Sequence, residues 1–77
     1  MPRRRHHTMY ARILRKATQI RRFTITNAAP SGWEVREEQD SRIIRATRYH
    51  DWHRVERARM DFAREALALR NGGWEEA

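Results

Sequence analysis

The segment from Asp51 to Arg70 constrains the fold most, because its apolar residues recur at the spacing of a helix that is apolar along one side only. These residues are Trp52, Val55, Phe62, Ala66 and Leu69. Charged residues occupy the opposite side, so such a helix must pack its apolar side on a second layer of structure. Asp51 is placed to cap the first turn, and the letters NGG after Arg70 are typical of a helix end.

Three short segments before this helix alternate apolar and polar residues, which is the pattern of half-buried strands. They read RFTITN from residue 22, WEVRE from residue 33 and RIIRATRY from residue 42, and turn-forming residues separate them. Segments joined by such short turns are expected to pair as an antiparallel meander. The third segment leaves its register open, so either Arg45 or Arg48 points outward.

Residues 9–22 have apolar side chains at helical offsets, which predicts a basic amphipathic helix. The apolar positions are Tyr10, Ile13, Leu14, Ala17 and Ile20. A strand is the weaker interpretation, because alternation would place Lys16 on the same face as Leu14 and Ile20. Residues 1–8 show no apolar periodicity and are expected to form a flexible basic arm.

The expected fold is therefore an α+β single domain with the element order α-β-β-β-α. It divides into the arm at 1–8, the basic amphipathic helix at 9–22 and a β-β-β-α domain at 23–77, in which the C-terminal helix packs on a three-stranded antiparallel sheet. The chain has 77 residues, which is enough for one small core. A core of this size gains stability from a partner, so a homodimer or a larger assembly fits the size as well.

The net charge of +7 is concentrated at the N-terminus, where residues 1–22 hold eight basic residues and no acidic one. Arginine accounts for nearly all of the basic residues, and its planar fork suits contacts with phosphates and bases. We therefore expect a small non-enzymatic accessory protein that binds RNA or DNA through the arm and the first helix. The predicted contact residues are Arg3, Arg4, Arg5, Tyr10, Arg12, Arg15, Lys16, Arg21 and Arg22.

Two other partners fit the same basic segment. An amphipathic helix over residues 9–22 could dock the protein onto a larger protein assembly, and this is the main alternative function. The same helix could also lie on an anionic membrane surface. No apolar run in the sequence is long enough to span a bilayer, and the absence of cysteine fits a reducing compartment such as the cytoplasm.

The stretch YHDWHR at residues 49–54 gathers groups that occur in metal sites and in metal-free ribonucleases. A metal needs several donors that converge on one point, but Asp51 is expected to cap the helix and no further ligand is evident. A ribonuclease would use His50, His53 and Arg54, with Tyr49 as another acid. The helix N-terminus disfavours a charged imidazole. The sequence thus predicts no metal, no cofactor and no catalytic residue, and it leaves a ribonuclease as the third function.

Overall fold

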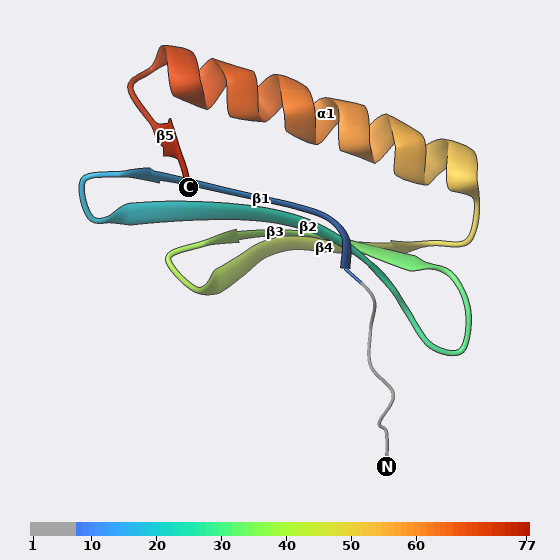
Figure 1. Cartoon of the computed structure of the whole chain (residues 1–77). Coiled ribbons are helices and arrows are strands. Elements are labelled where there is room, and N and C mark those ends of the chain that lie inside the picture. Colours follow the sequence, from blue (N-terminus) through green and yellow to red (C-terminus); the bar gives the residue numbers. More distant parts are fainter. Residues whose placement is uncertain (1–7) are drawn as a thin grey trace.

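Four strands follow one another and form an antiparallel meander: β1 (Thr8–Lys16), β2 (Gln19–Asn27), β3 (Trp33–Gln39) and β4 (Arg42–Tyr49). The helix α1 (Trp52–Asn71) and the two-residue strand β5 (Glu75–Glu76) complete the fold. In this computed structural model, which describes residues 8–77, the strand order is β4-β3-β2-β1-β5. The helix lies across one face of the sheet and leaves the other face uncovered (Figure 1).

The expected α-β-β-β-α order with a three-stranded sheet is wrong, because residues 9–22 belong to strands β1 and β2 and not to a helix. In the strand, Lys16 lies on the same face as Leu14, as alternation predicts. Ile20 lies on the opposite face, together with Arg15. The Lys16 ammonium group donates a 2.9 Å hydrogen bond to the carbonyl oxygen of Gly72. The Lys16 ammonium group thus has a hydrogen-bond partner at the edge of the core. Its position on the same face as Leu14 is therefore compatible with a strand.

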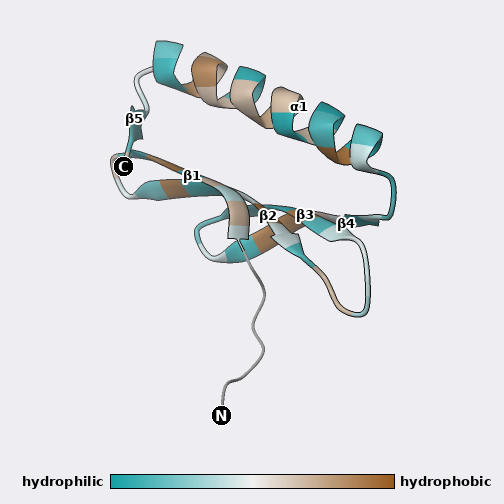
Figure 2. Cartoon of the chain, turned by 45° about the vertical axis from the view of Figure 1, so that its right-hand side comes forward, coloured by the Kyte–Doolittle hydropathy of each residue, from teal (hydrophilic) through white to brown (hydrophobic). Residues whose placement is uncertain are grey.

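The core lies between α1 and the sheet face beneath it, which we call the helix face. The helix contributes Val55, Phe62 and Ala66, and the sheet contributes Leu14, Phe23, Ile25 and Val35. The Phe23 and Phe62 rings pack with their centroids 4.8 Å apart. Figure 2 shows α1 with alternating hydrophobic and hydrophilic bands, as expected for a helix with one buried side. The helical periodicity predicted for residues 51–70 is confirmed.

Both ends of α1 agree with the sequence. Asp51 caps the first turn, since its carboxylate accepts a 3.0 Å hydrogen bond from the His53 amide. After the last turn, the amide of Trp74 donates to the carbonyl oxygen of Leu69 at 3.0 Å. The chain then continues into β5, which pairs with β1. This return along the sheet brings the C-terminal residues beside residues that lie more than sixty positions earlier in the sequence.

The register of β4 is now fixed. Tyr49, Thr47 and Arg45 pair with Trp33, Val35 and Glu37 of β3, so these β4 side chains lie on the helix face. Arg48 therefore lies on the uncovered side, which we call the open face. An irregularity in the pairing follows Glu37, and beyond it both Ile43 and Ile44 are exposed.

Candidate anion-binding cleft

The predicted contact residues of β1 and β2 separate into two groups in the structure. Tyr10, Arg12, Lys16 and Arg21 lie on the helix face, where they hold the elements together. Arg15 and Arg22 lie on the open face and make no ion pair within residues 8–77. Arg3, Arg4 and Arg5 precede the described residues. The nine predicted residues therefore do not form one surface within the part of the chain that the structure describes.

Arg12 connects β1 to the C-terminal strand. Its guanidinium group donates two hydrogen bonds to the carboxylate of Glu76, from Nε at 2.6 Å and from Nη2 at 2.7 Å. This bidentate contact lowers the pKa of Glu76 below its usual value and raises the pKa of Arg12 above its own. Arg12 therefore stabilises the closure of the fold and is not available to a phosphate without breaking that contact.

Arg21 connects β2 to β3 beneath the helix. Its Nη2 binds the Oε2 atom of Glu37, and it lies 3.4 Å from a carboxylate oxygen of Glu65 on α1. Only 3% of the Glu37 side chain is exposed, so cationic partners offset the cost of burying this carboxylate. Arg45 of β4 supplies the second partner, with its Nη2 3.1 Å from Oε1 of Glu37. This contact is an ion pair and not a well-directed hydrogen bond, since Oε1 has no hydrogen-bond partner among the described residues.

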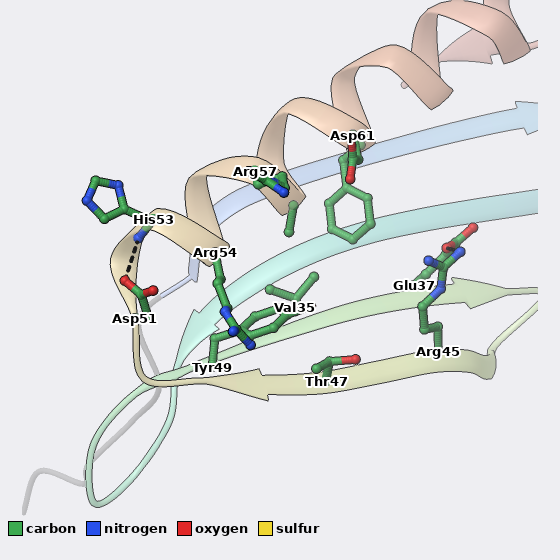
Figure 3. A pocket seen from close by; sticks show the side chains of 12 residues that line it. Val35, Glu37, Arg45, Thr47, Tyr49, Asp51, His53, Arg54, Arg57 and Asp61 are labelled. Atoms are coloured by element: carbon green, nitrogen blue, oxygen red, sulfur yellow. Dashed lines mark hydrogen bonds and ion pairs between the residues drawn. The ribbon is translucent and has the colours of Figure 1, made fainter.

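A cleft of about 550 Å³ opens on the helix face, between the first half of α1 and strands β3 and β4 (Figure 3). The buried core residues of the sheet come from β1, β2 and β3, whereas β4 places the polar side chains of Arg45 and Thr47 on the helix face. The wall made by the sheet contains Val35, Glu37, Arg45, Thr47 and Tyr49. The wall made by the helix and its cap contains Asp51, His53, Arg54, Arg57, Ala58, Asp61 and Phe62.

Three arginines from two elements line this cleft. Arg54 and Arg57 lie on successive turns of α1 and make no ion pair within residues 8–77. Arg45 faces them from β4, and 69% of its side chain is exposed. Figure 3 shows the side chain of Arg54 extending from the helix across the cleft toward Tyr49. Guanidinium groups that approach one space from two sides form a site for an anion.

The carboxylates that line the cleft do not cancel the charges of Arg54 and Arg57, because each carboxylate has another partner. Asp51 caps the helix, and Asp61 binds Arg64 at 3.1 Å. The pairing of Asp61 with Arg57, which their spacing in the sequence suggests, is therefore absent among the described residues. Glu37 is held by Arg21 on the core side. Among the described residues, the cations of Arg54 and Arg57 have no ion-pair partner at the cleft.

The floor of the cleft is apolar and partly aromatic. Val35 and Phe62 are buried there, and Tyr49 and Ala58 are half-buried. An apolar floor with arginines at the rim suits a ligand with a flat ring and a phosphate group better than it suits a small inorganic anion. The geometry thus combines two properties, attraction of negative charge and a surface on which a ring can lie.

The histidines do not assemble as a pair in this cleft. His53 lines it at the helix N-terminus, with its imidazole directed away from Arg54 and Tyr49 (Figure 3). His50 precedes the cap and is not among the lining residues. In residues 8–77, no group of three or more histidine, cysteine, aspartate or glutamate side chains is arranged to hold a metal ion.

Arg45 and Arg57 were not among the contact residues predicted from the sequence, and Arg54 was considered only as the cation of a ribonuclease site. A signal was present only for Arg54, which directly precedes Val55 and lies beside the apolar side of the helix. No such signal exists for Arg45, because its direction depended on the strand register. That register follows from the pairing with β3.

Comparisons with known proteins do not place the chain in a family: no family model, curated protein or solved structure matches it. Among residues 8–77, no helix is long and apolar enough to cross a membrane. The function must therefore be argued from the cleft and from the distribution of charge.

Proposed function

We propose that the protein binds single-stranded nucleic acid, with the phosphates held by Arg45, Arg54 and Arg57 at the cleft. The observation that carries this proposal is the approach of the unpaired α1 arginines to an apolar floor that contains Tyr49. Phosphate contacts supply most of the affinity in such complexes, and aromatic rings provide stacking for unpaired bases. The protein acts as a binding module, and no chemical step is part of the proposal.

The size of the cleft favours a single strand over a duplex. A volume of about 550 Å³ accommodates roughly one nucleotide, as judged from the size range of small-ligand sites. A base can reach the cleft floor only if it is unstacked, which is the normal state of single strands and loops. A duplex would place its phosphates on the rim and leave the floor empty, so it should bind more weakly.

The basic N-terminal segment adds attraction over a longer range in this proposal. Arg3, Arg4 and Arg5 contribute to the net charge of +7, and Arg15 and Arg22 project from the open face. Such charges increase the rate of encounter with a polyanion and lose most of their effect at high salt. The phosphate-contacting role assigned to Arg12, Lys16 and Arg21 is not retained, because these side chains have structural partners.

The two other functions considered from the sequence receive less support. Docking through an amphipathic helix at residues 9–22 is no longer proposed, since those residues form strands. A ribonuclease would need a base and an acid on either side of one phosphate, and only one of the two histidines lines the cleft.

Fluorescence anisotropy with labelled single-stranded RNA, single-stranded DNA and duplex DNA tests the proposal. We expect single strands to bind more tightly than the duplex, and the double variant Arg54→Glu/Arg57→Glu to weaken single-strand binding by about 100-fold, since each reversal replaces a charged contact by repulsion. The matched control is Arg59→Glu/Arg70→Glu, which makes the same charge change on α1 at residues that neither line the cleft nor pair with a residue that does. Equal losses in the two double variants would show that only net charge matters and would reject the cleft as the site.

A further inference from the structure

The open face of the sheet has no covering element in residues 8–77, although it carries several exposed apolar side chains. Ile20, Ile43 and Ile44 are 40%, 56% and 52% exposed, and Met9 of β1 is 46% exposed. The helix covers only the opposite face (Figure 1, Figure 2). Isolated exposed isoleucines are common, but several on one face of one sheet form a surface that association would bury.

The strand pairing arranges the open face in rows that run across the four long strands. One row reads Ile13, Arg22, Glu38 and Ile43 from β1 to β4. The next row reads Ala11, Thr24, Arg36 and Ala46. In each row the outer positions are apolar and the inner positions are polar, and in the first row the two inner residues have opposite charges.

We propose that the open face packs on the open face of a second copy of the chain, related by a two-fold axis that runs along the strands between β2 and β3. Such an axis reverses the order of each row, so β1 lies over β4 of the second copy and β2 lies over β3. Ile13 then meets Ile43, and Arg22 meets Glu38. Each of these contacts occurs twice, as the symmetry of a homodimer requires.

The second row supports the same arrangement. Ala11 meets Ala46, so two small residues lie opposite each other at the outer positions. Thr24 meets Arg36, and no pair of like charges is created. Face-to-face packing of two twisted sheets is a common architecture, with the two sets of strands inclined by about 30°. It would also bury Ile13 and Ile43, in addition to the seven clustered apolar residues in the core of residues 8–77 of one copy. The clefts with Arg54 and Arg57 lie on the helix faces and would remain accessible on both sides of the dimer.

A nucleic acid is the competing occupant of this face, because Arg15, Arg22, Arg36 and Arg48 lie on it. Two features favour the second copy. No aromatic side chain of the four long strands lies on the open face, so bases would find nothing to stack on. The arginines are also interspersed with Glu34 and Glu38, and Arg36 is paired with both. Alternating charge fits a self-complementary surface better than it fits a polyanion.

Variants that reverse the charge of Arg22 or Glu38 test the proposal. Sedimentation equilibrium over a range of protein concentrations measures the dimerisation of each variant. The wild type should be a dimer, and Arg22→Glu or Glu38→Arg alone should each weaken it at least about tenfold, since like charges would then meet across the interface. The double variant Arg22→Glu/Glu38→Arg should restore dimerisation. The control Arg64→Glu on α1 should leave it unchanged. Thermal unfolding of each variant, followed by circular dichroism, checks that the monomers remain folded.

Cross-linking provides a second test that does not depend on charge. The chain contains no cysteine, so Ala11→Cys and Ala46→Cys can each carry a single thiol. A short bismaleimide should join the two variants when they are mixed. It should not join either variant to itself, since equivalent positions are three strands, or about 14 Å, apart across the axis.

A monomeric wild type at all concentrations would overturn the proposal. A dimer that neither single charge reversal weakens would also overturn it. Loss of RNA binding by Arg22→Glu in a protein that never dimerises would assign the open face to nucleic acid instead.

Discussion

The two ends of the helix face use the same kind of side chain in opposite ways. At the end near the C-terminus, which we call the closed end, Arg12 and Lys16 are held by Glu76 and by the carbonyl of Gly72. At the end near the helix N-terminus, the open end, Arg54 and Arg57 face a cleft and have no ion-pair partner in residues 8–77.

The difference arises from what the chain supplies beside each arginine. Strand β5 returns along β1 and brings a carboxylate to the closed end. Within residues 8–77 no segment returns to the open end, where the acids on the cleft wall cap the helix or bind arginines other than Arg54 and Arg57. The role of an arginine is thus set by its neighbours in space. A count of charges along the sequence does not separate these two groups.

The largest effect is expected at Phe62, which packs on Phe23 and lines the cleft. Phe62→Ala should lower the free energy of unfolding by about 3–5 kcal/mol, because it removes a buried ring and leaves a cavity. Chemical denaturation measures this loss. Leu67→Ala on the exposed side of α1 is the control and should change stability by less than about 0.5 kcal/mol. A cost below about 1 kcal/mol for Phe62→Ala would mean that the helix is not packed as described.

Glu37 connects the two ends, since it holds Arg21 in the core and Arg45 at the cleft. Glu37→Gln should lower the free energy of unfolding by about 2 kcal/mol, because the buried arginine loses its charged partner. The same change releases Arg45, so binding to single-stranded RNA should become tighter. Denaturation and anisotropy on one protein sample measure both effects. Weaker binding by a folded Glu37→Gln variant would show that Arg45 does not contact phosphate.

The pH dependence of the closed end is a smaller effect. The bidentate contact with Arg12 lowers the pKa of Glu76 in the folded protein. The stabilisation is therefore complete above the unfolded pKa of about 4.3 and is lost as the pH falls through the lower folded value. The contribution should be a few tenths to about 1 kcal/mol, as for a partly exposed ion pair. Comparing wild type with Glu76→Gln between pH 7 and pH 2 should show a difference that disappears in acid, and a constant difference would reject the assignment.

Part of this fold could be predicted from local patterns. The helix from Trp52 to Asn71 was predictable because its apolar spacing and its caps agree with one another. Strands β3 and β4 were predictable from alternation and turn residues. Strand β1 was not, because its helix face carries Arg12 and Lys16 beside Tyr10 and Leu14. These cations became compatible with a buried face only through partners more than fifty residues away.

The candidate site was harder to predict than the fold for the same reason. Arg45 and Arg57 line one cleft only because β4 pairs with β3 in one register and α1 crosses above them. Neither the strand register nor the position of α1 can be predicted from the residues that neighbour these arginines in the sequence. Residues 1–22 do contain no acidic residue, as the sequence shows. The described part of this segment forms strands, however, and its arginines are divided between the two faces of the sheet.

The salt dependence of binding, measured on two matched pairs of charge-neutralising variants, tests the division between the ends most directly. Arg54→Met/Arg57→Met should reduce the slope of log affinity against log salt by about 1.4 for single-stranded RNA, since each lost phosphate contact removes about 0.7. Its unfolding temperature should stay near that of the wild type. Arg12→Met/Lys16→Met should lower the unfolding temperature and leave the slope unchanged. The opposite result, an unchanged slope in the first variant and a reduced slope in the second, would contradict this account.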